Sequence, residues 1–117
     1  MILLDTDIVI EMLHKRRYEV GAISIITLIE VLRGSKAEKR KRVKKLLEES
    51  FDIVNINNQV IETYCSIYRN LKEKGLLIPD ADTLIAATAI SNNMTLKTRD
   101  KHFKELKKFD LKLAQLK

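Results

Sequence analysis

Four carboxylic acids stand where the sequence pattern places strand ends or the first turns of helices. Asp5 directly follows the apolar run 2–4, and Asp100 follows a short strand expected at 94–98. Glu30 lies one turn into the helix expected after the second strand, and Asp82 lies in the first turn of a helix of small residues. The carboxyl ends of parallel strands share one edge of a sheet. We therefore expect the four acids to meet in one crevice.

Such a crevice needs a compensating charge, because neighbouring carboxylates repel one another and raise each other's pKa values. Hard divalent ions such as Mg²⁺ and Mn²⁺ remove that repulsion and prefer oxygen ligands. Two histidines and one cysteine are too few for a structural zinc site. The acids therefore favour a site for Mg²⁺ or Mn²⁺.

Each acid also has a purely structural explanation. Thr27 and Glu30 fit a capping box, in which the glutamate accepts a hydrogen bond from the backbone N–H of the cap. Asp80 and Asp82 suit a helix N-terminus, where negative side chains are favourable. A turn after a strand would account for Asp100. The joint placement, rather than any single acid, indicates a site.

The elements that would position these acids alternate along the chain. We expect strands at 2–4, 22–26, 51–56 and 94–98, and an edge strand at 111–116. Helices are expected at 7–14 with Asp7 as cap, from Thr27 to Gly34, at 35–50, from 57 or 58 to about 74, at 79–91 and at 101–107. This alternation predicts one α/β domain, residues 1–117, with a parallel sheet flanked by helices on both faces.

Four segments carry recognisable motifs, in this order: Leu3-Leu4-Asp5-Thr6, Ser24 to Gly34, Pro79 to Ala89, and Thr95 to Asp100. The most specific is Asp-x-x-Ile-Ala-Ala, from Asp82 to Ala87. At these spacings the chain resembles the PIN-domain family and, within it, the small VapC-type toxins of toxin–antitoxin pairs. The resemblance covers nearly the whole chain, and the family's parallel sheet agrees with the alternation of elements.

The resemblance implies a metal-dependent ribonuclease that hydrolyses RNA phosphodiester bonds. Its catalytic acids would fall on Asp5, Glu30, Asp82 and Asp100. We expect Asp5 and Asp82 to bind Mg²⁺ or Mn²⁺ directly, and the other two acids to bind through water or to orient the attacking water. Polar positions that support the carboxylates match Thr6 and Thr98, with Asp80 as a neighbour.

The resemblance also implies partners: a VapB-like antitoxin and a second copy of the chain. The early helices, at 8–13 and 46–47, are the candidates for the antitoxin groove. Arg69 matches an arginine that the family often places before the Asp-x-x-Ile-Ala-Ala motif. The alternative is a catalytically silent PIN module that binds RNA or a protein.

The chain is basic, with 22 Lys and Arg against 16 Asp and Glu and a net charge of +6. Seven of the basic residues stand between Lys36 and Lys45. They would form either a phosphate-contacting face that steers RNA to the acids or a solvated helix face offset by nearby glutamates. We predict RNA binding there, by Lys39, Arg40, Lys41 and Arg42.

Composition excludes several other classes of protein. The longest uncharged stretches fall short of the roughly 18 apolar residues of a membrane span. Asp5 interrupts the apolar N-terminus, which argues against a signal peptide, and a single cysteine suits a reducing compartment, so we expect a cytoplasmic protein. Six scattered aromatic residues argue against a stacking platform for bases. A receiver-type signalling domain would need an acid after the strand at 51–56, where Asn57 and Asn58 stand.

Overall fold

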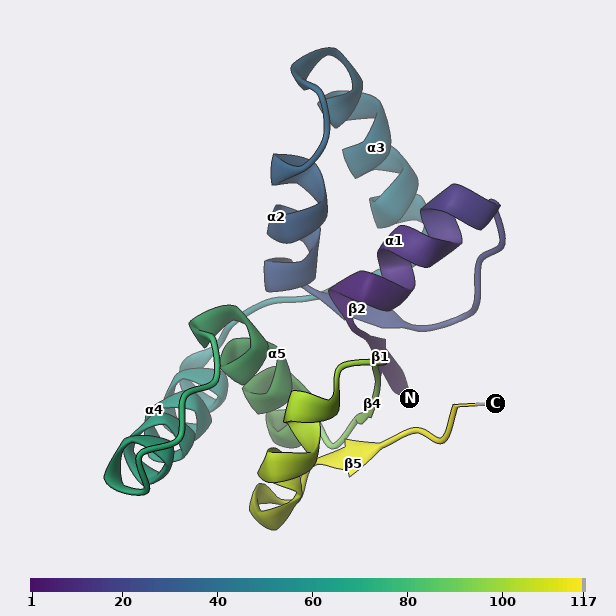
Figure 1. Ribbon diagram of the computed structural model, residues 1–117. Helices are drawn as coiled ribbons and strands as arrows, with labels where there is room; N and C mark the ends of the chain where they lie inside the picture. Colours follow the sequence, from purple (N-terminus) through teal and green to yellow (C-terminus); the bar gives the residue numbers. More distant parts are fainter. Residues whose placement is uncertain (117) are drawn as a thin grey trace.

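The computed structural model describes residues 1–116, so Lys117, the last residue of the predicted domain, lies outside the described residues. Five short strands form one parallel sheet (Figure 1). They are β1 (Ile2–Leu4), β2 (Ala22–Ser24), β3 (Asp52–Val54), β4 (Thr95–Lys97) and β5 (Lys112–Leu113), in the order β3-β2-β1-β4-β5. Leu3 of β1 pairs with Ala22 on one side and with Leu96 on the other. The predicted α/β class with an all-parallel sheet is confirmed.

Six helices pack around this sheet in two groups. The first group is α1 (Thr6–Lys15), α2 (Ile25–Arg33) and α3 (Ala37–Ser50). The second is α4 (Asn58–Glu73), α5 (Asp80–Ser91) and the 3₁₀ helix η1 (Lys101–Phe109). Figure 1 shows the two groups as separate arms that diverge from the sheet. Helices therefore flank the sheet on both faces, as expected.

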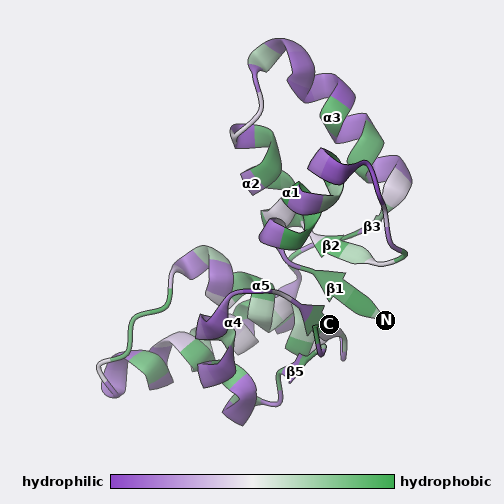
Figure 2. Ribbon diagram, turned by 45° about the vertical axis from the view of Figure 1, so that its right-hand side comes forward, coloured by the Kyte–Doolittle hydropathy of each residue, from purple (hydrophilic) through white to green (hydrophobic). Residues whose placement is uncertain are grey.

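Alternation along the central strand divides the core between the two arms. Leu3 packs into the cluster of α4, α5 and η1, whereas Leu4 packs into the cluster of α1, α2 and α3. Successive side chains of a strand point to opposite faces, so one strand supplies both clusters. Figure 2 shows β1 and β2 as hydrophobic, whereas hydrophobic and hydrophilic residues alternate along the helices. The sheet is buried on both faces, as parallel sheets require.

Two helix starts differ from the predicted ones. Asp5, not Asp7, is the N-cap of α1, and its carboxylate accepts a hydrogen bond from the Thr6 backbone N–H at 2.8 Å. Ser24, not Thr27, is the N-cap of α2, and its hydroxyl accepts from the Thr27 N–H at 3.1 Å. Serine is a strong N-cap residue, and β2 ends directly at Ser24, so the helix begins there. The capping box proposed for Thr27 and Glu30 is therefore wrong.

The other boundaries shift by a few residues, and the elements are otherwise those predicted. Strands β2, β3, β4 and β5 are shorter than expected, and α3 begins at Ala37 instead of Ser35. The C-terminal helix extends to Phe109 and is a 3₁₀ helix. Pro79 is the N-cap of α5 and makes no side-chain hydrogen bond, so neither Asp80 nor Asp82 is the cap.

The residues expected to line an antitoxin groove are mostly core residues. Ile8, Val9 and Met12 of α1 and Leu47 of α3 are buried against one another. A helix that turns its apolar stripe into a core cannot present the same stripe to a partner. That placement of the groove is wrong for these four positions.

Candidate active site

The predicted acids come from four elements at the edge of the sheet where β1 and β4 end. Asp5 follows β1, Asp100 lies between β4 and η1, Asp82 is in the first turn of α5, and Glu30 is on α2. The tightest group consists of Asp82, Asp100 and His102, whose ligand atoms lie within 4.8 Å of one another. The two carboxylates converge as expected, and the exposed His102 lies with them.

Asp5 is the most buried of the acids, with 5% of its surface exposed. The Thr98 hydroxyl donates to its Oδ2 at 2.6 Å, and the Thr6 backbone N–H donates to its Oδ1 at 2.8 Å. Burial raises the pKa of Asp5 to about 7, and these hydrogen bonds oppose that rise. Because little water reaches the Asp5 carboxylate, a cation bound next to it would stabilise its ionised form.

Thr98 connects Asp5 to Asp100. The hydroxyl oxygen of Thr98 accepts a hydrogen bond from the Asp100 backbone N–H at 3.0 Å while its hydrogen goes to Asp5. The hydroxyl orientation is thereby fixed, and one buried side chain sets the positions of both acidic residues. Thr98, which we expected to support the carboxylates, thus contacts both Asp5 and Asp100 directly.

Glu30 is oriented by two hydroxyl groups. The Thr6 hydroxyl donates to Glu30 Oε1 at 2.6 Å, and Thr27 Oγ1 lies 3.1 Å from Thr6 Oγ1. Thr6 has a single hydroxyl hydrogen, which the carboxylate receives, so Thr27 must be the donor to Thr6. Thr27 is fully buried. It belongs to the hydrogen-bond network around Glu30, and sequence reasoning missed it because its apparent role was that of a helix cap.

Asp82 shows how close the acids are electrostatically. Burial is the main cause that raises its pKa, followed by the negative charges of Asp100 and Glu30. Three of the predicted acids thus act on one another in the crevice, without a nearby lysine or arginine among the causes of the shift. His102 opposes the rise in pKa and Arg33 pairs with Glu30 at 3.4 Å, but the carboxylates outnumber these groups, so the oxygen-rich site fits Mg²⁺ or Mn²⁺.

The turn between β4 and η1 is anchored to α1. The Arg99 backbone N–H donates to Asp7 Oδ2 at 3.1 Å, and the Arg99 guanidinium pairs with Glu11 at 2.9 Å. Asp7 also accepts from the Ile8 N–H at 2.8 Å. Asp7, expected as a cap, instead fixes the segment that carries Thr98 and Asp100.

Asp80 lies on the other side of the α5 N-terminus, against α4. The Tyr64 hydroxyl donates to Asp80 Oδ1 at 2.7 Å, and this hydrogen bond, followed by burial and the charge of Asp80, raises the pKa of Tyr64 to about 12.

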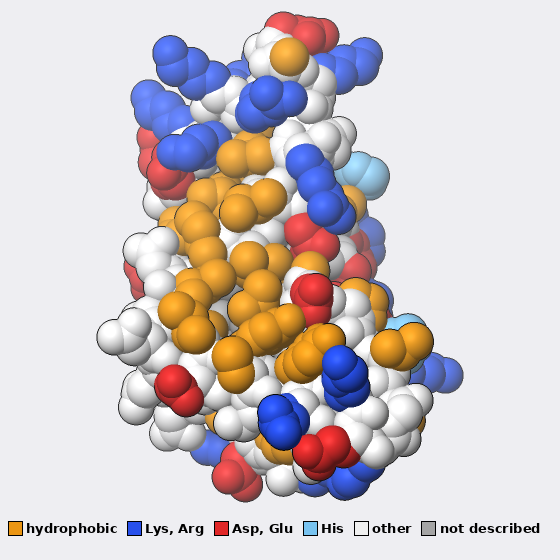
Figure 3. All heavy atoms as spheres, turned by 90° about the vertical axis from the view of Figure 1, so that its left-hand side faces the viewer, with side chains coloured by type: hydrophobic (Ala, Val, Ile, Leu, Met, Phe, Trp, Pro, Cys, Tyr) orange, Lys and Arg blue, Asp and Glu red, His pale blue; other side chains and the backbone are white. Residues whose placement is uncertain are grey.

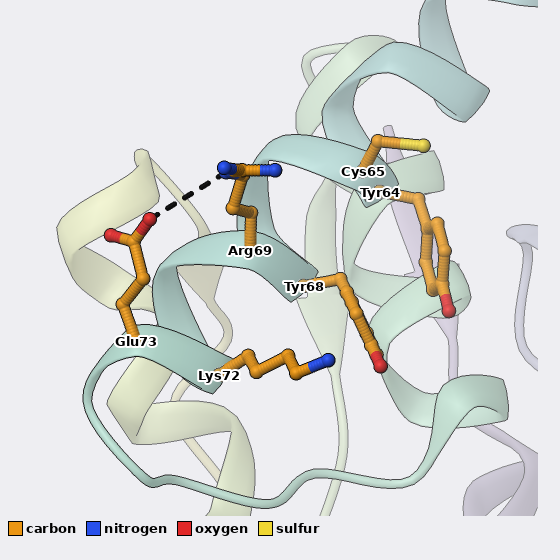
Figure 4. A pocket seen from close by; sticks show the side chains of 6 residues that line it. All are labelled: Tyr64, Cys65, Tyr68, Arg69, Lys72 and Glu73. Carbon is orange, nitrogen blue, oxygen red and sulfur yellow. Dashed lines mark ion pairs between the residues drawn. The ribbon is translucent and has the colours of Figure 1, made fainter.

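Tyr64 borders a hollow of about 530 Å³ on the surface of α4 (Figure 4). Figure 4 also shows Arg69 turned towards Glu73, with which it forms an ion pair of 3.5 Å. Asp80 therefore braces α5 against α4, and Arg69 has a partner on its own helix.

The basic run of α3 is not part of the crevice. Figure 1 places the start of α3 at the far end of its arm. Lys39, Arg40, Lys41 and Arg42 are exposed, while farther along the helix Lys44 pairs with Glu48 at 2.8 Å. Any effect of this run on a ligand at the acids acts over a distance.

Within residues 1–116, no helix is long and apolar enough to cross a membrane.

Comparison with known proteins gives one consistent result. The sequence model of the PIN domain matches residues 2–109. Ribonuclease VapC1 of Methanocaldococcus jannaschii is 47% identical over 116 residues, which cover 96% of this chain and 85% of that protein. The structure of VapBC-1 from nontypeable Haemophilus influenzae is similar with a TM-score of 0.81 and 26% identity, over 98% of both chains. VapBC2 from Rickettsia felis, bound to a DNA fragment from its promoter, gives a TM-score of 0.76 and 29% identity over the full length of both chains.

Proposed function

The chain belongs to the PIN-domain family, and from this premise we propose that it is the toxin of a VapBC-type pair, an endoribonuclease that requires Mg²⁺ or Mn²⁺. The observation that carries the proposal is the convergence of Asp82 and Asp100 within 4.8 Å, beside the buried Asp5. The similarity to a ribonuclease over almost the whole chain supports the same activity.

Asp5, Asp82 and Asp100 would hold the metal, and Glu30 would act on water. A bound divalent ion supplies a nucleophilic water at neutral pH and stabilises the charge that builds up on the phosphate oxygens. Thr98 holds the Asp5 carboxylate in one orientation. Thr6 does the same for Glu30, which would orient the attacking water. The chain thus contributes positioned oxygen atoms and needs no nucleophilic side chain.

The partner follows from the relatives and from the surface. Solved structures that resemble this chain are toxin–antitoxin complexes, which supports a VapB-like antitoxin for this protein. Figure 3 shows a band of hydrophobic side chains that runs from the α2–α3 arm towards the α4–α5 arm. Exposed apolar residues of these arms include Ile29, Leu46, Ile61, Tyr68 and Leu77. We assign the antitoxin to this band, and we propose a cytoplasmic homodimer.

The test is cleavage of RNA by the purified protein. Total RNA is incubated with the protein and Mg²⁺ or Mn²⁺, with EDTA and the Asp82→Asn variant as controls. We expect cleavage by the wild type with metal only. Cleavage that persists in EDTA or in Asp82→Asn would refute the metal-carboxylate mechanism, and metal-independent RNA binding without any cleavage would favour a silent module.

A further inference from the structure

The 3₁₀ helix η1 contains a three-residue repeat. Its nine residues, from Lys101 to Phe109, read Lys-His-Phe, Lys-Glu-Leu and Lys-Lys-Phe. A 3₁₀ helix has three residues per turn, so side chains three positions apart lie above one another. The repeat therefore sorts η1 into three straight rows, of which one is apolar, one is mixed and one consists of Lys101, Lys104 and Lys107. We call this last set the lysine row.

The apolar row fixes the geometry of the lysine row. Phe103 and Leu106 are fully buried, and Phe109 packs against the same core. In an α-helix of 3.6 residues per turn, residues three apart would drift by about 60° at each step, and this row would leave the core. Runs of 3₁₀ helix this long are uncommon. The packing of the apolar row thus keeps the lysines in a straight line on the exposed side.

The lysine row borders a hollow of about 340 Å³ that opens beside the acids. Thr98 and Asp100 also line this hollow, together with the segment from Leu113 to Leu116. All three residues of the lysine row line it, whereas no residue of the mixed row does. The row therefore begins next to Asp100, one of the four acids, and extends along η1 from there.

The lysine row has charge available for a ligand. Among the described residues, 1–116, no carboxylate lies within 4.0 Å of its three ammonium groups, whereas Lys44 and Lys45 of α3 are both paired with glutamates. With a rise of about 2 Å per residue, successive lysines of the row are spaced by about 6 Å along the helix. That spacing is close to the separation of neighbouring phosphates in an extended strand, and lysine is a common phosphate ligand.

We propose that the lysine row binds successive phosphates of the RNA strand on one side of the cleavage point. The strand then leaves the acids along η1, through the hollow beside β5. This inference rests on the proposed ribonuclease function and names the residues that hold its substrate. RNA is favoured over an acidic protein segment because the row begins next to Asp100, one of the acids of the proposed ribonuclease site, so that an RNA strand cut at the acids can continue along the row.

The test is RNA binding in the absence of cleavage. In the Asp82→Asn background, without divalent metal, anisotropy of a short fluorescein-labelled single-stranded RNA is measured against salt concentration. For the triple variant Lys101→Gln, Lys104→Gln and Lys107→Gln, we expect about tenfold weaker binding at low salt. We also expect the slope of log affinity against log salt to fall by about 2, as for the loss of three phosphate contacts on a single strand.

Two matched controls separate position from total charge. The triple variant Lys36→Gln, Lys44→Gln and Lys45→Gln removes the same charge from the other arm and should weaken binding by no more than about twofold. On η1 itself, Lys104→Gln should weaken binding more than Lys108→Gln, which lies in the mixed row. Circular dichroism of every variant verifies that the fold is intact.

The outcomes distinguish this inference from the proposed function. Equal losses in the two triple variants, or a greater loss of affinity for labelled polyglutamate than for RNA in the lysine-row variant, would overturn the inference. Metal-dependent cleavage by a lysine-row variant with unchanged RNA affinity and salt slope would overturn it as well and leave the ribonuclease standing. If the lysine-row variant binds RNA more weakly, but the protein with Asp82 intact cleaves no RNA in the presence of metal, the inference is supported and the ribonuclease function is refuted.

Discussion

The acid crevice and helix α3 both depend on charge, yet the fold holds their charges in different ways. In the crevice, Asp5 and Glu30 each receive a hydrogen bond of 2.6 Å from a threonine hydroxyl. In α3, the consecutive residues 39–42 are exposed and point around the helix at about 100° intervals. Chemistry on a phosphate requires atoms at fixed positions, whereas attraction of a polyanion requires only a sufficient number of charges.

This contrast predicts different sensitivities to substitution. In the crevice, removal of a single atom should change the rate of RNA cleavage. In α3, RNA affinity should change only when the total charge of the helix changes. The predictions that follow begin with the substitution of largest expected effect.

Asp5→Asn should reduce RNA cleavage by more than about a hundredfold, because it removes a negative charge from the metal site. The same variant should be more stable than the wild type in EDTA. Because burial raises the pKa of Asp5 to about 7, the folded protein binds a proton that the unfolded chain releases near pH 4, so the wild type loses stability as the pH rises through this window.

Thermal melting from pH 4 to pH 8 measures the effect of Asp5→Asn on stability. The difference in Tm between the variant and the wild type should be small near pH 4 and grow up to about pH 8, to an equivalent of roughly 4 kcal/mol. A constant difference across this range would contradict the assigned role of burial.

Thr98→Val should reduce cleavage by about 10- to 100-fold, because groups that orient metal ligands have effects of this size. It leaves the Asp100 N–H without its acceptor and Asp5 Oδ2 without its donor, at a cost of about 1–3 kcal/mol in the free energy of unfolding. Thr98→Ser keeps the hydroxyl and serves as the control. If both variants were equally impaired, the methyl group rather than the hydroxyl would be the important part of Thr98.

Thr27→Val should reduce kcat by roughly fivefold without changing RNA affinity, because the loss of one buried hydrogen bond is worth about 1 kcal/mol. Valine has nearly the same shape as threonine, so the substitution removes only the hydroxyl that donates to Thr6. Thr27→Ser should retain the rate. Single-turnover kinetics measure the effect, and in a Thr6→Val background the Thr27→Val change should have little further effect, since the two hydroxyls act in series.

Arg40→Glu with Lys41→Glu should have the smallest effect on the reaction. RNA affinity at low salt should fall by about two- to fivefold and its salt dependence should become flatter, while the single-turnover rate at saturating protein stays unchanged. Arg40→Lys with Lys41→Arg conserves the charge and should behave like the wild type. An altered single-turnover rate in the charge-reversed protein would break the contrast between α3 and the crevice.

The sequence was sufficient for the order of elements and for the convergence of Asp82 and Asp100, because apolar periodicity and strand-end acids are local patterns. It was insufficient to choose the N-cap of α2, because Ser24 and Thr27 are both good capping residues and stand three positions apart. The end of β2 at Ser24 decides the choice. The sequence also missed the contact between Asp7 and the Arg99 N–H, which are 92 residues apart in the chain. Contacts of this kind depend on the assembled sheet, and no local rule contains them.

The row structure of η1 was missed for a related reason. The repeat of Lys and Phe or Leu at every third position is visible in the sequence, but a period of three is close to the 3.6 of an α-helix. The sequence alone does not decide between the two helices, and the structure shows a 3₁₀ helix over Lys101–Phe109.

The hydrogen bond between Thr98 and Asp5 joins residues that are 93 positions apart, at the two ends of the chain. A ribosome that adds about 5–20 residues per second needs about 5–20 s to synthesise the intervening segment. Until β4 is made, β1 lacks one of its two neighbouring strands and Asp5 lacks its hydroxyl partner. Synthesis of the chain therefore contains a built-in delay, during which a nascent protein cannot assemble its complete set of acids.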